Sequence, residues 1–239
     1  MINVLVITHN RLRYLQKCIK SIIKQDTEII LNVWDNGSVD GTKEYLRKLI
    51  KLKILNGIFF DSYKNHGTAI ARNSGLSAIN DKFIFMSDDD MYHNKSCVRL
   101  SLELMELLNK NDSYSVVGPY NPFEGDQYKK ILIGEFKIDK FLVNKVTVLP
   151  PGAWLLDKEI VMFYGGFKLP PNKLMGFSSW KLPDRMRKGG FNFAYLKGYE
   201  NNKFVNSEHM DIASHLLNEI EFYEKSGYNK FRRNQKGVK

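Results

Sequence analysis

The chain has 239 residues, of which 43% are hydrophobic and 26% charged, as in a globular protein with room for one large α/β domain or two small halves sharing a sheet. No apolar run approaches the roughly 20 residues of a membrane-spanning helix, which argues against an integral membrane protein. The formal charge of +10 favours an anionic partner such as nucleic acid, an acidic membrane surface or a phosphate-bearing substrate, although a lysine-rich surface without functional meaning explains it equally well.

Cysteine usage and the N-terminus indicate the cytoplasm. Cys18 and Cys97 are the only cysteines, and their spacing is not that of a metal site, so a reduced compartment is expected. The N-terminus enters a predicted strand without the pattern of a secretion signal. We therefore expect a soluble cytoplasmic protein, either free or peripheral to a membrane through the basic C-terminal string YNKFRRNQKGVK.

The first ninety residues alternate predicted strands and helices. Apolar, β-branched runs predict strands at residues 2–8, 29–34 and 58–63 and in the run that begins at residue 83. Apolar periodicity and capping residues predict helices at residues 12–24, at 43–52 and after Gly67. This alternation predicts a parallel sheet that binds ligands beyond the carboxyl ends of its strands.

The later residues are more mixed. The pattern predicts a helix at 95–108, an antiparallel hairpin within 128–138, a strand and short helix within 149–167, a basic helix at 180–188, a strand at 191–196 and a helix near 211–224.

Three consecutive carboxylates, Asp88, Asp89 and Asp90, follow the fourth predicted strand. Because adjacent like charges repel one another, a chain that places them at the mouth of a sheet has usually arranged a cation there. Oxygen-only ligation favours Mg²⁺ or Mn²⁺, which commonly also hold phosphate oxygens. From the residues alone, a solvated acidic turn is the alternative.

Five segments occur in series: VLVITHNRLRYLQKCIKSI, VWDNGSVDGT, NHGTAIARNSGL, FMSDDDMY and PGAWLLDKEIVMFYGGF. In this order they resemble the family 2 type of nucleotide-sugar glycosyltransferase, over roughly residues 2–192. The resemblance implies an α/β GT-A fold, with a Rossmann-like, mostly parallel central sheet flanked by helices and a smaller antiparallel acceptor-side part. It further implies a nucleotide-sugar-binding half at 1–110, an acceptor-binding half at 111–200, and a C-terminal helix and basic tail at 201–239.

The resemblance also assigns roles. It implies that a nucleotide-diphosphate sugar, foremost a UDP-sugar, is bound by Thr8, Asn10, Arg11, Asp35, Arg72, Asp88 and Asp89. Asp35 would accept a hydrogen bond from the base, and Arg72 would lie near the diphosphate. Asp88, Asp90 and His209 would hold Mn²⁺ or Mg²⁺, which would neutralise the leaving nucleoside diphosphate.

Simpler explanations exist for the same residues. Asn10 and Asp35 are common turn formers, and Arg72 has the character of a structural brace. His209 is equally explained as a surface histidine.

The segment GFSSWKLPDRMRKGGF at 176–191 departs from the family pattern. Inverting members carry acids, one of them the general base, where this chain has Ser178, Ser179 and Lys181. A serine hydroxyl is no base near neutral pH without an activator of its own. Ser178 and Ser179 are also good helix caps.

Three explanations of this departure stay open. The base comes from elsewhere, with Asp184 and Asp157 as candidates; or the enzyme retains anomeric configuration and needs no protein base; or the chain binds a nucleotide sugar without transferring it. On the acceptor side the resemblance implies Trp154, Ser178, Ser179 and Trp180, although Trp154 is as readily a core residue.

We therefore expect a metal-dependent glycosyltransferase, a hexosyl- or pentosyltransferase acting on a hydroxyl. The basic charge allows two acceptor classes, a glycan or lipid-linked precursor and a modified base of DNA. The alternative is a noncatalytic nucleotide-sugar or polyanion-binding protein that has lost its base. The sequence carries no signal for an oligomeric state.

Overall fold

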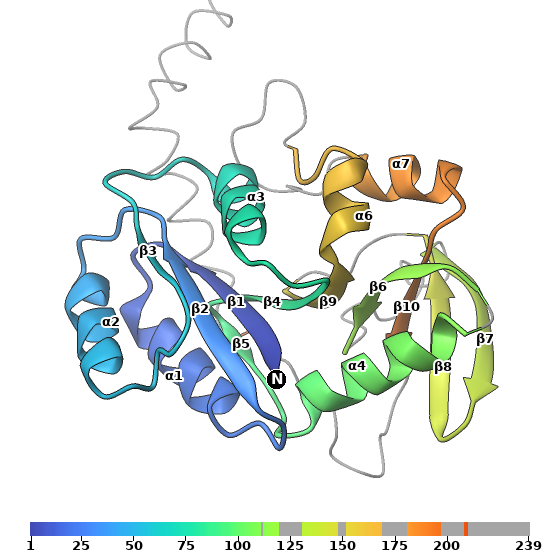
Figure 1. Cartoon of the computed structure of the whole chain (residues 1–239), viewed down its shortest axis with the longest axis horizontal. Coiled ribbons are helices and arrows are strands. Elements are labelled where there is room, and N and C mark those ends of the chain that lie inside the picture. The colour runs from blue at the N-terminus through green and yellow to red at the C-terminus, as the bar shows by residue number, and fades with distance from the viewer. Residues whose placement is uncertain (111, 120–130, 148–151, 169–180, 197–207, 210–239) are drawn as a thin grey trace, which may run out of the picture.

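The computed structural model describes residues 1–110, 112–119, 131–147, 152–168, 181–196 and 208–209. They form a nine-stranded sheet covered by helices, together with a two-stranded pair (Figure 1). The strands are β1 (Ile2–Thr8), β2 (Ile29–Asp35), β3 (Phe59–Asp61), β4 (Phe83–Asp88), β5 (Met91–Tyr92), β6 (Tyr114–Gly118), β7 (Leu132–Ile138), β8 (Phe141–Val146), β9 (Ala153–Asp157), β10 (Asn192–Leu196) and β11 (Glu208–His209). The helices are α1 (Leu12–Ile22), α2 (Thr42–Lys51), α3 (Thr68–Ala78), α4 (Cys97–Leu108), α6 (Lys158–Phe163) and α7 (Leu182–Lys188).

The N-terminal part of the sheet is parallel, as its buried, apolar strands predict. Strand β1 is buried along its whole length and pairs in parallel with β2 on one side and β4 on the other. The register places Thr8 opposite Asp35, and Ile7 opposite Asp88. The carboxyl ends of β1, β2 and β4 therefore meet at one edge of the sheet, the edge where the candidate site lies.

The other half of the sheet is largely antiparallel. The strand order is β3-β2-β1-β4-β9-β6-β10-β8-β7, and β9 runs antiparallel to both β4 and β6. The hairpin expected within 128–138 is longer than predicted: residues 132–138 form only its first strand, β7, and its second strand, β8, lies beyond the predicted span. Residues 128–130 lie outside the described residues. The predicted α/β class, with a mostly parallel sheet and an antiparallel part, is confirmed. The expected boundary near residue 110 stays a prediction, since one sheet runs through both parts.

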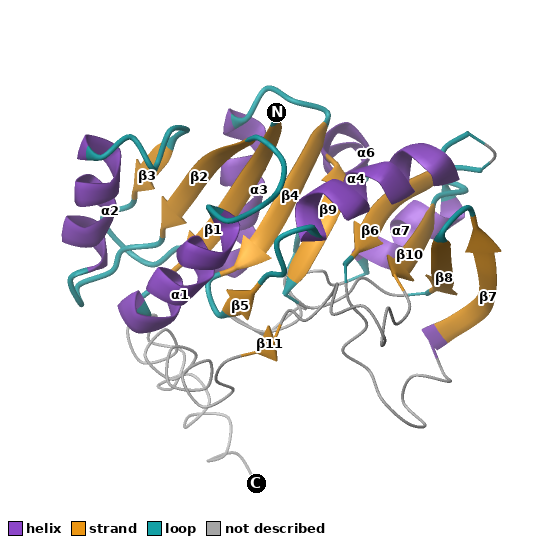
Figure 2. Cartoon of the chain, turned by 90° about the horizontal axis from the view of Figure 1, so that it is seen from below, coloured by secondary structure: helices purple, strands orange, loops and turns teal. Residues whose placement is uncertain are grey.

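Two hydrophobic clusters fill the faces of the sheet. Side chains of α1, α2 and α4 pack with one face, and those of α3, α6 and α7 with the other (Figures 1 and 2). The apolar stripe of α1 shows why: Leu15, Cys18, Ile19 and Ile22 are buried while its lysines face solvent. Helix α3 approaches β1 so closely that a Cβ on Gly75 would lie 2.7 Å from Leu5.

Several predicted boundaries need correction. The strand expected at 58–63 is only Phe59–Asp61, and the helix expected from residue 95 begins at Cys97. The basic helix begins at Leu182 rather than at residue 180, because Lys181 adopts a left-handed conformation (φ 51°) and Pro183 occupies the first turn. The predicted caps Ser178 and Ser179 and the helix near 211–224 lie outside the described residues. Among the helices described, none is long and apolar enough to cross a membrane.

Candidate functional site

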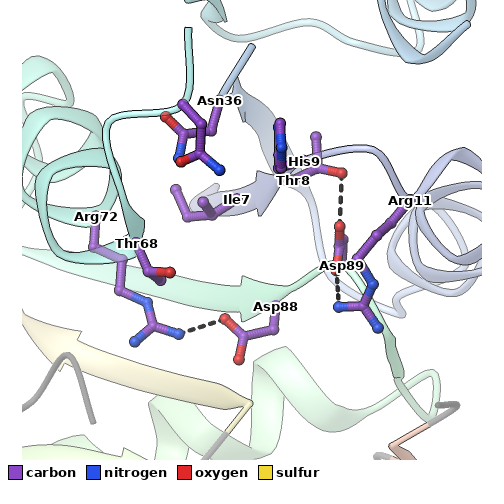
Figure 3. A pocket seen from close by; sticks show the side chains of 10 residues that line it. Ile7, Thr8, His9, Arg11, Asn36, Thr68, Arg72, Asp88 and Asp89 are labelled. Carbon is purple, nitrogen blue, oxygen red and sulfur yellow. Dashed lines mark hydrogen bonds and ion pairs between the residues drawn. The ribbon is translucent and has the colours of Figure 1, made fainter. Parts of the chain in front are cut away.

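A pocket opens at the carboxyl edge formed by β1 and β4 (Figure 3). Its walls come from these strand ends, from the loops after β1, β2 and β3, and from α3. The lining residues are Ile7, Thr8, His9, Arg11, Asn36, Asn65, Thr68, Arg72, Asp88 and Asp89. Of the residues predicted to bind a nucleotide sugar, the fold brings together Thr8, Arg11, Arg72, Asp88 and Asp89.

Arg11 neutralises two of the three adjacent carboxylates. Its Nη1 lies 2.7 Å from Asp89 Oδ1, and its Nη2 lies 2.9 Å from Asp90 Oδ2. Thr8 Oγ1 donates to the other Asp89 oxygen at 2.6 Å. Burial raises the pKa of Asp89 to about 7, against the opposing effect of Arg11. Arg11 was predicted to contact the ligand. In this structure its guanidinium forms ion pairs with Asp89 and Asp90.

Asp88 lines the pocket and pairs there with Arg72. Its Oδ1 accepts a hydrogen bond from Arg72 Nη2 at 2.5 Å, and the two side chains point toward one another across the pocket (Figure 3). The Arg72 guanidinium also lies 4.7 Å from the ring centroid of Trp154. Trp154 is only 3% exposed and packs in the core beneath Arg72, as the core alternative predicts.

Asp90 points elsewhere. Its side chain is fully buried against Arg11 and does not line the pocket, whereas Asp88 does. Among the residues that the structure describes, no three His, Cys, Asp or Glu side chains are grouped as a metal site would need. The predicted ligands Asp88 and Asp90 are therefore neighbours in sequence that face different surroundings. The backbone of His209 pairs with Met91, next to Asp90, because β11 runs antiparallel to β5.

Two loops that frame the pocket are tied to each other. Asn36 Nδ2 donates to Asn65 Oδ1 at 2.7 Å, and Asn36 Oδ1 accepts from the His66 backbone at 3.0 Å. Gly37 (φ +85°) allows this approach, since a Cβ there would lie 2.5 Å from the Lys64 backbone.

Asn10 joins a further loop to this frame instead of lining the pocket. Its backbone N–H donates to Ser38 Oγ at 2.8 Å, and its Oδ1 accepts from the Val39 backbone at 2.8 Å. These bonds explain its left-handed backbone (φ 51°), which asparagine tolerates better than most residues. In this structure Asn10 connects the loops after β1 and β2.

Asp35 is fully buried behind the pocket wall. Its Oδ1 accepts from the Ser38 backbone at 3.0 Å, while its Oδ2 has no hydrogen-bond partner among the described residues. Burial raises the pKa of Asp35, and the hydrogen bonds from Ser38 oppose this shift. An unsatisfied buried carboxylate oxygen is costly, and such groups often serve a ligand.

Comparison with known proteins identifies the family to which this arrangement belongs. Residues 3–165 match the family described as Glycosyl transferase family 2. The chain belongs to this family. Glycosyltransferase GlyG of Streptococcus pneumoniae is 24% identical over 185 residues, which cover 73% of this chain and 56% of GlyG. The chain thus spans little more than half the length of that relative.

Solved structures give the same fold. The S. aureus protein TarS superposes with a TM-score of 0.59 at 17% identity, over 82% of this chain and 36% of TarS. The mannosyltransferase PcManGT from Pyrobaculum calidifontis, solved with GDP-Man and Mn²⁺, superposes with a TM-score of 0.62 at 15% identity, over 84% of this chain and 59% of that one. These likenesses confirm the predicted GT-A fold.

The two carboxylates predicted as the general base of this family 2 chain lie away from the pocket. Asp157 pairs with Phe83, at the opposite end of β4 from Asp88, and its side chain caps α6 by accepting from the Ile160 backbone at 3.2 Å. Asp184 lines a different hollow, beside Asn192 at the start of β10. Neither lines the pocket.

Ser178, Ser179 and Trp180 lie outside the described residues, so their predicted acceptor roles stay predictions.

The family 2 pocket also contains residues that sequence reasoning missed: His9, Asn36, Asn65 and Thr68. Each is polar and stands just after a strand or at the start of α3. That position was a usable signal, because polar residues beyond the carboxyl ends of parallel strands tend to face the ligand.

Proposed function

We propose that the chain is a glycosyltransferase that uses a nucleoside diphosphate sugar, foremost a UDP-sugar, as its donor. The observation that carries this proposal is the Asp88–Arg72 pair in a polar pocket at the carboxyl edge of a family 2 fold. Support comes from its structural neighbours: TarS has been solved with UDP-GlcNAc, and PcManGT with GDP-Man.

The pocket offers separate groups to the phosphates and the base. The Arg72 guanidinium matches phosphate geometry, and Thr68 lies beside it at the first residue of α3, where a helix favours anions. The unsatisfied Oδ2 of Asp35 would accept the N–H of a nucleobase after a small movement of Asn36. Both uracil and guanine have a suitable N–H.

The charge and the donor atoms of the aspartate cluster support the proposal that it holds a hard divalent cation. When ionised, Asp88, Asp89 and Asp90 carry three negative charges against the two positive charges of Arg11 and Arg72. The donor set is oxygen, which suits Mn²⁺ or Mg²⁺. We propose that Asp88 and Asp90 hold the ion and that His209 completes the set of ligands. Asp90 would give up its ion pair with Arg11 to bind the metal. Such an ion would neutralise the leaving nucleoside diphosphate.

A second candidate function, donor binding without transfer, is favoured by one observation. Among the described residues, the carboxylates that line the pocket are Asp88 and Asp89, and both are already engaged by arginines. Neither is placed as a base for an acceptor hydroxyl. Transfer therefore needs a base from residues outside the described ranges, or a retaining mechanism.

The acceptor follows from charge only as a class. A glycan or lipid-linked precursor and a modified DNA base both remain in the proposal, as does contact of the basic tail with a membrane. Binding to DNA at rising salt distinguishes the two acceptor classes. A steep loss of affinity supports DNA as the acceptor, and an absence of binding at low salt excludes DNA.

One experiment separates transfer from binding. The chain is incubated with Mn²⁺ and a panel of UDP-, GDP- and dTDP-sugars, and released nucleoside diphosphate is measured. A glycosyltransferase slowly hydrolyses its donor without acceptor, so release from one donor supports the enzyme. Binding of a donor without any release supports the second candidate. If no donor is bound and none is hydrolysed, both candidates are contradicted.

A further inference from the structure

The turn at residues 164–167, which follows α6, is bound directly by α3. Asn73 Nδ2 donates to the Phe167 carbonyl at 2.9 Å, and the Phe167 N–H donates to Asn73 Oδ1 at 2.8 Å. One side-chain amide thus satisfies both backbone groups of Phe167. Asn73 is the residue next to Arg72 on α3, so the turn is fixed beside the arginine of the pocket.

The approach of the turn to α3 requires glycine. Gly166 has φ +60°, and a Cβ there would lie 2.5 Å from Asn73 Oδ1. A side chain at this position would be strained and would push Asn73 away from the turn. The contact is therefore built into the local sequence Gly166-Phe167.

The Phe167 side chain supports the Arg72 guanidinium. Phe167 is 2% exposed and stacks on Trp154, with ring centroids 5.6 Å apart and an interplanar angle of 21°. The guanidinium carbon lies 4.7 Å from the Trp154 centroid and 5.5 Å from that of Phe167. The two rings support one side of the guanidinium while Asp88 binds its Nη2, so its orientation toward the pocket is restricted.

The same turn is held from the other side by α7. Arg185 Nε donates to the Tyr164 carbonyl at 2.7 Å, and its Nη2 donates to the Gly166 carbonyl at 2.9 Å. Helices α3, α6 and α7 cover one face of the sheet (Figure 1). Hydrogen bonds and ring contacts therefore run without a break from α7 through the turn and Phe167 to Arg72 and Asp88.

We propose that Phe167 and Asn73 are positioning residues that fix the Arg72 guanidinium for the donor diphosphate, and that they tie donor binding to the placement of α7. This inference rests on the proposed function, because it assumes that Arg72 binds the diphosphate. Neither residue lines the pocket. Both act through Arg72.

The test measures calorimetric binding of UDP and of GDP, each with Mn²⁺, to the full chain and its variants. We expect Phe167→Leu to weaken binding about tenfold, because the guanidinium loses a desolvated ring contact. Phe167→Tyr, which keeps the ring, is expected to bind the nucleotides about as tightly as the unaltered chain. Asn73→Ala leaves both rings in place and gives an independent test, with a loss of about fivefold expected.

Two controls separate positioning from general stability. Phe141→Leu makes the same truncation at a fully buried residue of the other core cluster, and it should lower the unfolding temperature while leaving nucleotide affinity unchanged. In an Arg72→Lys background, Phe167→Leu should add little further loss, because both changes remove the same contact.

Two results would overturn the inference while leaving the proposed function intact: Phe167→Leu binding like Phe141→Leu, or losses from Phe167→Leu and Arg72→Lys that simply multiply. If the unaltered chain binds neither nucleotide, the proposed function fails and this inference fails with it.

Discussion

Asp88 is the side chain on which donor chemistry should depend most. It lines the pocket and pairs with Arg72 there, whereas Asp89 and Asp90 are held by Arg11. A carboxylate in this position would hold the metal and the arginine that together receive the charge of a leaving diphosphate. Its substitution should therefore affect turnover more than folding.

We expect Asp88→Asn to lower the rate of donor hydrolysis about a hundredfold, since it removes a charged ligand of the proposed metal ion that would neutralise the leaving diphosphate. The measurement is nucleoside diphosphate release with Mn²⁺. Asp61→Asn is the matched control, because Asp61 ends strand β3 of the same sheet and pairs with Lys43 and Arg47 outside the pocket. Equal losses in the two variants would show that Asp88 has no special role.

His93 makes stability depend on pH. It is 2% exposed, and burial lowers its pKa to about 4. Ser87 Oγ donates to the Asp88 carbonyl, so His93 Nε2, 2.8 Å from Ser87 Oγ, is assigned as the protonated nitrogen donating to it. The folded chain thus holds a neutral imidazole, while the unfolded chain titrates near pH 6.5.

Below pH 6.5 the unfolded state binds more protons at this site, so the free energy of unfolding should fall as pH decreases toward 4. In urea unfolding at pH 7 and pH 5, the unaltered chain should lose about 2 kcal/mol more than His93→Gln, because the two proteins share the titration of all other groups. His93→Gln should lose this part of the pH dependence, although it starts from a lower stability. An identical pH dependence in both proteins would contradict the assignment.

At the scale of elements, the loops after β2 and β3 form one frame over the pocket. Gly37→Ala should break it, because a Cβ would lie 2.5–2.9 Å from the backbones of Lys64 and Asn65. We expect a loss of about 1–3 kcal/mol in stability and weaker nucleotide binding. Gly190→Ala is the control: Gly190 also has positive φ (+87°), but nothing lies within 4 Å of its Cβ position. Equal effects on binding would show that the close approach is unimportant.

The elements were predictable to different depths. The buried strands β1, β2 and β4 could be predicted because a strand buried on both faces of a sheet is a continuous apolar run, and polar residues mark its end. The convergence of Thr8, Arg72 and Asp88 followed from that. The ion pair of Arg11 with Asp90 did not, because it depends on side-chain directions across residues 79 apart. Asp157 lies away from the pocket because β9 runs antiparallel to β4, which a sequence pattern does not reveal.

At the scale of the whole molecule, the site joins the two parts of the sheet. The parallel strands β1 and β4 supply Thr8 and Asp88, while the antiparallel part supplies Trp154 and Phe167 under Arg72. Donor binding should therefore stabilise the molecule as a unit. The formal charge of +10 adds a general attraction for anionic ligands, which added salt screens.

Calorimetric titration of UDP and of GDP into the chain, with Mn²⁺ and again with EDTA, tests whether the pocket binds a donor nucleotide through a metal ion. We expect at least one nucleotide to bind with Mn²⁺, EDTA to weaken this binding at least about tenfold, and Asp88→Asn to weaken it similarly. Failure of both nucleotides to bind in the presence of Mn²⁺ would contradict this expectation.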